Sequence, residues 1–193
     1  MTIPAQKKFD NPSRLFIWLF SLGNFLRSSS YYKQLLEHMK LTGNESVLEF
    51  GSGTGYLAKK LAPKLQPNGN LACIDVSNKL ISHVQKKLKK YSNIKYYSGE
   101  LINQSIPDQS FDFIVSSWVI HHVDRSVLSE NIQKFHSLLK KQGKAFIIEF
   151  SDEKYDHTQL KESKLINLFV QAQFSYKIIF RKDKSILYEF AKQ

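Results

Sequence analysis

Short apolar runs alternate with longer amphipathic segments from Ser46 onward, and this alternation constrains the fold of the 193-residue chain most strongly. Short β-rich runs are typical of buried strands, and apolar residues repeated at helical spacing indicate helices. The expected strands are Val47–Phe50, Leu71–Asp75, Ile94–Tyr97, Phe113–Ser116 and Lys144–Phe150. The expected helices between them are Tyr56–Leu65, Asn78–Tyr91 and Val127–Lys140. This order predicts βαβ units and a mainly parallel sheet with helices on both faces.

The alternation of expected strands and helices changes at the end of the chain. After an expected helix over Gln159–Gln173, the two β-rich runs Phe174–Phe180 and Ser185–Ala191 flank a short polar loop. Two such runs predict an antiparallel hairpin. Together with the five earlier strands, the hairpin gives an expected seven-stranded sheet.

The beginning of the chain has no strand pattern. Its two expected helices are Arg14–Leu26 and Tyr31–Met39. We therefore expect an N-terminal helical extension over residues 1–45 and a single α/β domain over residues 46–193.

Composition excludes some classes of protein. With 42% hydrophobic and 23% charged residues, the chain is not of the disordered class. Its single cysteine, Cys73, cannot form an internal disulfide, and no thiol cluster is present to hold a metal. No run reaches the roughly 18 continuous apolar residues of a spanning helix, so we expect a cytoplasmic protein. The net charge of +11 does not by itself select a partner, because a lysine run is usually a solvated helix face.

The most informative motif lies at the end of the first expected strand. It reads Glu49-Phe50-Gly51-Ser52-Gly53-Thr54-Gly55 and leads directly into an expected helix. Glycines permit positive φ and a close approach of ligand to backbone, and a helix N-terminus offers unpaired N–H groups. These properties predict a nucleotide-binding turn.

Two nucleotide-binding patterns fit this turn poorly. The dinucleotide fingerprint fails when counted from Gly51, and it passes from Gly53 only by leaving Glu49 and Gly51 unused. The phosphate-loop signature fails because no Gly-Lys-Ser/Thr follows.

Residues 49–55 resemble the first motif of class I S-adenosylmethionine-dependent methyltransferases, in which an acidic residue precedes three alternate glycines. The resemblance extends from about Ser46 to the C-terminus and implies a Rossmann-like methyltransferase fold. Further landmarks follow in the family's order, namely Asp75 at the second strand's end, Ser98-Gly99-Glu100, Ser110–Ser116, Trp118–Val123 and Leu138–Lys144.

The resemblance implies a cofactor, S-adenosylmethionine, and a role for each matching residue. Glu49 would hold the methionine amino group, and Asp75 would bind the ribose. Val76 would lie against the adenine, Glu100 would meet the adenine amine, and Ser116 would contribute backbone beside the methionine moiety. The loop residues that would pass close to the ligand are Gly51, Ser52, Gly53 and Gly55. Purely structural roles are the alternatives. Glu49 could be a surface residue of its strand, and Asp75 could cap the helix that begins near Ser77.

A general base is required only when the methyl acceptor holds a proton at working pH. His121 and His122 are the candidates, because they follow a strand end and an unperturbed imidazole pKa of about 6.5 suits proton transfer. No carboxylate set suited to a metal is apparent, so we expect no metal.

The acceptor is expected to be a small or lipid-like molecule. Ser116-Ser117-Trp118-Val119 departs from the Asn/Asp-Pro-Pro-aromatic motif of nucleobase amine methyltransferases, so nucleic acid is not favoured. Phe9-Asp10 and the following helices resemble the entry segment of quinone and phospholipid methyltransferases. Residues 14–27 are apolar nearly all round the helix between Arg14 and Arg27, and we expect them either to cover the acceptor site or to contact a membrane surface.

Three alternatives stay open at this point. The chain could be an RNA or protein methyltransferase that uses its positive charge, a non-catalytic relative that binds S-adenosylmethionine, or an NAD enzyme. The oligomeric state cannot be predicted from these patterns.

Overall fold

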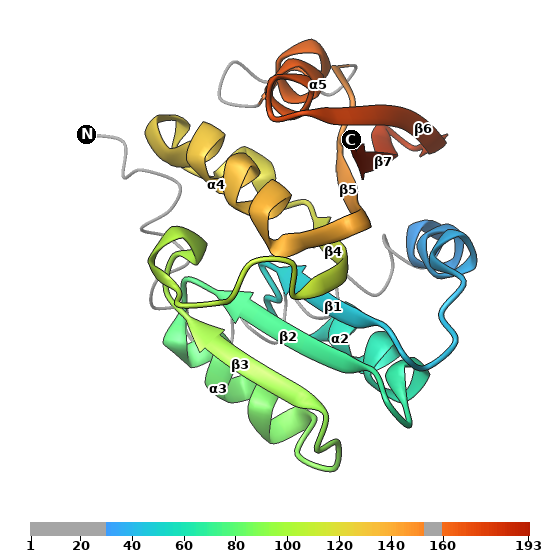
Figure 1. Ribbon diagram of the computed structural model, residues 1–193, viewed down its shortest axis with the longest axis vertical. Helices are drawn as coiled ribbons and strands as arrows, with labels where there is room; N and C mark the ends of the chain where they lie inside the picture. The colour runs from blue at the N-terminus through green and yellow to red at the C-terminus, as the bar shows by residue number, and fades with distance from the viewer. Residues whose placement is uncertain (1–29, 153–159) are drawn as a thin grey trace. The chain divides into compact units, whose positions relative to one another are not determined.

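The computed structural model describes residues 30–152 and 160–193 (Figure 1). The chain divides into two units, one that ends at Gln104 and one that begins at Ser105. The expected helix Arg14–Leu26 lies outside the described residues, as do most of residues 1–45, so the expected N-terminal extension remains a prediction. No helix within the described ranges has the length and apolarity needed to cross a membrane.

The first unit contains three parallel strands. They are β1 (Ser46–Phe50), β2 (Asn70–Asp75) and β3 (Ile94–Ser98), in the order β3-β2-β1. Their register pairs Phe50 with Ile74 and Asp75 with Ser98, so the carboxyl ends of all three strands meet at one edge. Ligands of open α/β sheets bind at this edge.

Two helices connect these strands. Helix α2 (Tyr56–Leu61) passes into a 3₁₀ turn, η2 (Ala62–Leu65), where Pro63 interrupts the expected ten-residue helix. Helix α3 (Asn78–Lys87) begins at the N-cap Ser77, whose hydroxyl accepts a hydrogen bond from the N–H of Leu80 at 3.4 Å. Both helices lie on the same side of the strands (Figure 1). Helix α3 ends at Lys87 rather than at the expected Tyr91.

A further helix over residues 30–39 confirms the expected helix Tyr31–Met39. Tyr31, Leu35 and Met39 are buried at helical spacing. Tyr32 packs against Tyr56 of α2, with ring centroids 5.6 Å apart.

The second unit contains four strands in the order β4-β5-β7-β6. β4 (Phe111–Ser117) runs parallel to β5 (Leu139–Phe150), whereas β7 (Ser185–Lys192) is antiparallel to both β5 and β6 (Phe174–Lys182). The terminal hairpin is therefore confirmed. β5 begins earlier than expected because Leu139 already pairs with Phe111, before an irregularity leads to the pair Phe113–Lys144.

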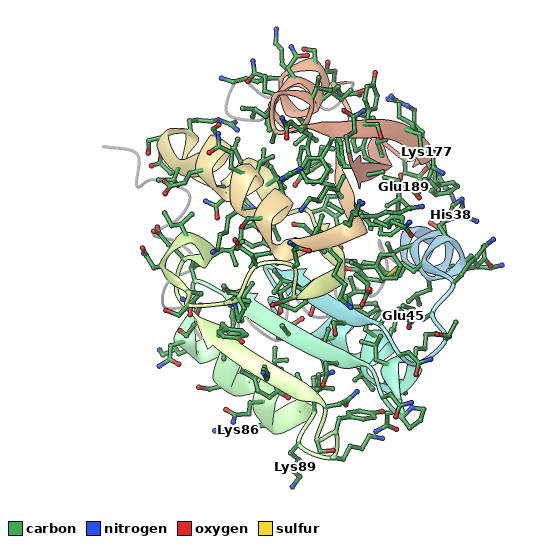
Figure 2. All side chains as sticks on the ribbon, in the orientation of Figure 1. His38, Glu45, Lys86, Lys89, Lys177 and Glu189 are labelled. Atoms are coloured by element: carbon green, nitrogen blue, oxygen red, sulfur yellow. The ribbon has the colours of Figure 1, made fainter. Side chains whose placement is uncertain are left out.

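Two helices pack in the second unit, α4 (Arg125–Leu138) and α5 (Glu162–Gln171). Phe169 of α5 stacks on Phe190 of β7 at a centroid distance of 3.8 Å, and both side chains are fully buried. On β7, Glu189 accepts from Lys144 and from Lys177, each at 3.1 Å, which ties three neighbouring strands together (Figure 2). The α/β fold class, with mainly parallel strands and an antiparallel end, is confirmed.

Replacing Phe169 by alanine should destabilise the second unit by removing this aromatic packing. Phe169→Ala removes a ring that is fully buried against Phe190, so we expect the free energy of unfolding to fall by about 3–5 kcal/mol. The control is Val170→Ala on the same helix, because Val170 is 49% exposed and its truncation should cost less than about 0.5 kcal/mol. Urea unfolding measures both variants, and equal losses would contradict the assigned packing.

Candidate functional site

The loop from β1 to α2 adopts a conformation that requires its glycines. Gly51, Gly53 and Gly55 have φ angles of 75°, 52° and 70°, a region that is unfavourable for residues with a side chain. At Gly55 space is also short, because an added Cβ would lie 3.0 Å from both Cγ atoms of Val84 on α3. The tight turn brings its backbone to the carboxyl edge of the strands, but these N–H groups are not unpaired as expected. Those of Gly51 and Ser52 donate to the carbonyl of Ile74, and that of Gly55 donates to the carbonyl of Ser52.

Asp75, the last residue of β2, is the centre of this edge. Its Oδ2 accepts a hydrogen bond from the N–H of Gly53 at 2.9 Å, and its Oδ1 accepts from the N–H of Ser77 at 2.9 Å. The side chain therefore does not cap α3, whose N-cap is Ser77, but it holds the chain just before that helix and also holds the glycine loop. Each carboxylate oxygen keeps a further lone pair for another donor. Burial raises the pKa of Asp75, although the two N–H groups partly offset this effect.

Glu49 is a buried carboxyl beneath the same loop. Only 4% of the residue is exposed, so it is not a surface strand residue. Burial raises its pKa to about 8, against a smaller opposing effect of hydrogen bonds from Ser52, Ala58 and Cys73. The thiol of Cys73 lies 3.8 Å from Glu49 Oε2. A carboxyl in such surroundings gains strongly from a cation that binds beside it.

The turn after β3 is hydrogen-bonded to the last residue of β2. The N–H of Gly99 donates to the carbonyl of Asp75 at 3.0 Å, and Gly99 has a φ of 104°. Gln104 Nε2 donates to the carbonyls of Ser98 and Glu100, at 3.2 and 3.1 Å. Glu100 is half-buried, and Asn103 Nδ2 donates to its Oε2 at 3.4 Å. Val76, directly after Asp75, is 39% exposed.

The first unit thus brings together all but one of the expected cofactor residues. Those at its carboxyl edge are Glu49, Gly51, Ser52, Gly53, Gly55, Asp75, Val76 and Glu100. The structure adds Lys87, whose Nζ donates to the carbonyl of Thr54 within the loop at 2.9 Å. The sequence predicts no role for Lys87, because no local signal separates it from the neighbouring lysines.

The remaining expected cofactor residue, Ser116, belongs to the second unit. It lies near the end of β4, opposite Ile147 of β5, and is 1% exposed. Within the described residues, its buried hydroxyl has no hydrogen-bond partner.

The two expected histidines lie in the short 3₁₀ turn η4 (Ile120–His122) after β4. His121 Nδ1 lies 2.7 Å from Oε2 of Glu149, and the other oxygen of Glu149 accepts from the N–H of Ile120 at 2.7 Å. Since a carboxylate oxygen accepts, Nδ1 carries the hydrogen of this bond. In a neutral imidazole Nε2 is then the nitrogen with a free lone pair.

His122 has a different environment from His121. Its ring lies 3.9 Å, centroid to centroid, from that of His121. Burial, and secondly the neighbouring His121, lower the pKa of His122 to about 4. The pKa of His122 therefore lies well below the range in which an imidazole exchanges protons at neutrality.

Glu149 is a functional candidate that the sequence analysis missed. It occupies the end of β5 and is 5% exposed. A signal was present, because an acidic residue interrupts the apolar run Lys144–Phe150 one position before its end. Its partner, however, is 28 positions away in the chain, so only the fold reveals the pair.

Metal ligation has no support in the described geometry. Within residues 30–152 and 160–193, no group of three or more His, Cys, Asp or Glu side chains is arranged to hold a metal ion.

Comparison with known proteins gives relatives over most of the chain. An uncharacterized methyltransferase of Anoxybacillus flavithermus is 30% identical over 132 residues, which are 68% of this chain and 58% of the relative. The ubiquinone/menaquinone biosynthesis C-methyltransferase of Rickettsia akari is 29% identical over 117 residues, 58% of this chain and 46% of the relative. The chain therefore spans about half the length of these curated relatives.

A solved structure supports the fold over nearly the whole chain. The S-adenosylmethionine-dependent methyltransferase from Aquifex aeolicus matches with a TM-score of 0.73 and 20% identity, over 99% of this chain and 98% of that one. The family described as a methyltransferase domain matches residues 47–143, which is half of the chain. The protein therefore belongs to the class I S-adenosylmethionine-dependent methyltransferase family.

Proposed function

We propose that this protein transfers the methyl group of S-adenosylmethionine to a small or lipid-like acceptor. The observation that carries the proposal is the carboxyl edge of the first unit, where two buried carboxyls flank a glycine turn in a chain of this family. Asp75 is fixed by two backbone N–H groups, and Glu49 has no cation among the hydrogen bonds described for it.

The residues present suit the parts of this cofactor. Glu49 would hold the methionine ammonium, whose positive charge compensates the burial of the carboxylate. Asp75 would accept from the ribose hydroxyls with its remaining lone pairs, and Val76 and Glu100 would contact the adenine. The backbone of Gly51, Ser52, Gly53 and Gly55 would lie along the ligand, with Ser116 contributing at the end of β4. When bound, S-adenosylmethionine supplies a methyl group activated on a sulfonium.

His121 is the proposed general base. Its Nε2 would take a proton from the acceptor, while Glu149 holds the ring by Nδ1 and stabilises the positive charge that forms on the imidazole. His122 is the weaker candidate, because burial disfavours its charged form and lowers its pKa to about 4. The N–H of Ile120 fixes Glu149 in turn.

A fixed base favours an acceptor that must lose a proton, such as a phenol or a reduced quinone. Loss of a hydroxyl proton makes the oxygen, and the ring carbon ortho to it, nucleophilic. The name of the R. akari relative, a quinone C-methyltransferase, is consistent with this class. The apolar segment of residues 14–27, with Arg14 and Arg27 at its ends, supports a peripheral contact with a membrane that carries such an acceptor.

Removing the Asp75 carboxylate should weaken cofactor binding. Asp75→Ala removes the proposed acceptor of the ribose hydroxyls. It also removes the carboxylate to which the N–H groups of Gly53 and Ser77 donate. We therefore expect the affinity for S-adenosylmethionine to fall at least about tenfold, or 1.4 kcal/mol. Equilibrium dialysis measures the change. The control is Asp108→Ala at an exposed position, which should bind as the wild type does. Unchanged affinity in a folded Asp75→Ala protein would refute the assignment.

Glu49 should make the stability of the ligand-free protein depend on pH. Its pKa of about 8 in the folded state exceeds the ordinary value of 4.5, so between these values only the folded state keeps the proton. The contribution of this bound proton to the free energy of unfolding is fully present below about pH 4.5 and is lost as the pH rises through 8. Glu49→Gln removes this dependence. We expect its free energy of unfolding, relative to wild type, to rise by about 2–4 kcal/mol between pH 5 and pH 8.

Urea unfolding of both proteins at the two pH values tests this expectation. Asp108→Asn serves as the exposed carboxyl control. Parallel pH dependence in Glu49→Gln and wild type would show that Glu49 ionises normally. The same Glu49→Gln variant should also bind S-adenosylmethionine more weakly, because the ammonium loses its carboxylate.

Loss of the base should reduce turnover without reducing cofactor affinity. We expect His121→Asn to lower kcat by about 10²–10⁴-fold and Glu149→Gln to lower it less, because the amide that replaces the carboxylate can still contact the ring. The assay measures S-adenosylhomocysteine formation with a short-chain prenylated hydroquinone as acceptor. His38→Asn, at an exposed position, is the matched control. Wild-type turnover in His121→Asn would eliminate this base.

A further inference from the structure

The surface built by α2, α3 and the start of β3 carries an unusual excess of positive charge. Residues 56–95 contain nine lysines and no arginine, and their single acidic residue is the buried Asp75. We name these residues the lysine surface: Lys59, Lys60, Lys64, Lys79, Lys86, Lys87, Lys89, Lys90 and Lys95.

The lysine surface spans adjoining helices rather than a single run. Lys87 of α3 donates to the carbonyl of Thr54, just before α2. Burial lowers the pKa of Lys87, and the nearby charge of Lys59 on α2 lowers it further. Figure 2 shows Lys86 and Lys89 projecting away from the ribbon. The charges of Lys59 and Lys87 therefore lie close enough to repel one another across the two helices, and Lys86 and Lys89 point outward to solvent.

These charges are not neutralised within the described parts of the chain. None of the nine lysines forms an ion pair with a described carboxylate. In the second unit the pattern differs, because Lys140 pairs with Asp112 at 2.8 Å, and Lys144 and Lys177 both pair with Glu189. An uncompensated cationic surface destabilises the isolated protein slightly and attracts an anionic partner.

We propose that the lysine surface binds the anionic headgroups of a lipid bilayer. Lysine is a point charge suited to a diffuse planar array of anions, whereas arginine is the residue enriched for bidentate recognition of nucleic-acid phosphates and bases. Residues 30–104 contain no arginine. Lys60 and Lys90 also lie over the rings of Tyr56 and Tyr91, at 5.2 and 4.9 Å, where a nucleobase would otherwise stack.

This contact is separate from methyl transfer and does not depend on it. It also differs physically from the proposed contact through residues 14–27, which is mainly apolar and resists salt. A contact through lysines weakens as salt shortens the Debye length from about 10 Å at 0.1 M to about 3 Å at 1 M.

Co-flotation of the full chain with vesicles tests the proposal. We expect at least about tenfold tighter binding to vesicles of equal parts phosphatidylserine and phosphatidylcholine than to phosphatidylcholine alone at low salt, and loss of this difference at about 1 M salt. The triple variant Lys79→Gln, Lys86→Gln, Lys89→Gln should bind at least about tenfold more weakly, because each lysine near an anionic surface contributes to the attraction. All three residues are exposed and lie outside the proposed cofactor site.

A matched variant separates the lysine surface from net charge. Lys141→Gln, Lys164→Gln, Lys184→Gln removes the same charge from exposed positions of the second unit and should bind within about twofold of wild type. Equal losses in the two variants, no vesicle binding by wild type, or preferential binding of poly(U) over the vesicles would each overturn the proposal. Salt-resistant binding that the first variant does not change would also overturn it, while leaving the contact through residues 14–27 intact.

Discussion

The carboxylate of Asp75 holds together the carboxyl edge on which the proposed cofactor site depends. One oxygen accepts from Gly53 in the loop before α2, and the other accepts from Ser77 at the start of α3. The neighbouring carbonyl of Ile74 accepts from Gly51 and Ser52, both at 2.9 Å. A single strand end thus positions the loops that begin two helices. Burying this charge is unfavourable, and the two N–H groups offset part of that cost.

The two acidic residues Glu49 and Glu149 show how differently buried carboxyls can be stabilised. Glu149 contacts His121 and the N–H of Ile120, so its hydrogen-bonding capacity is engaged within the second unit. Glu49 has only weaker partners, the Cys73 thiol among them, and burial raises its pKa to about 8. A buried carboxyl without a strong partner is typical of a functional site. The difference is the physical reason for assigning Glu49 to a cationic ligand and Glu149 to orienting a base.

Much of the fold follows from local pattern. The strands β1, β2 and β3 were predicted to within about a residue at either end, because β1 and β2 are mostly buried apolar runs, β3 is rich in β-forming residues, and glycine or polar residues bound all three. The early start of β5 was not predicted, since Lys140 and Lys141 look like a helix end, and only the pairing of Leu139 with Phe111 reveals a strand. Burial and long-range pairing decide such cases, and neither is visible in a local window.

The candidate site was predictable to the extent that its residues lie in one motif. The glycine loop and Asp75 were identified because their order and spacing resemble the methyltransferase family, and the three glycines do adopt positive φ. The partnership of His121 with Glu149, and the contact of Lys87 with Thr54, required the fold, because each joins positions far apart in sequence. The histidines' unlike environments were equally invisible, since adjacent residues of one type carry no local signal.

Calorimetric titration of the wild-type protein with S-adenosylhomocysteine, with NADH as the control ligand, tests the central claim most directly. The account predicts saturable binding of one S-adenosylhomocysteine per chain, because Glu49, Asp75 and the glycine turn form a single site. It predicts no binding of NADH. Binding of NADH alone, or the absence of binding by a protein shown to be folded, would contradict the proposed cofactor site.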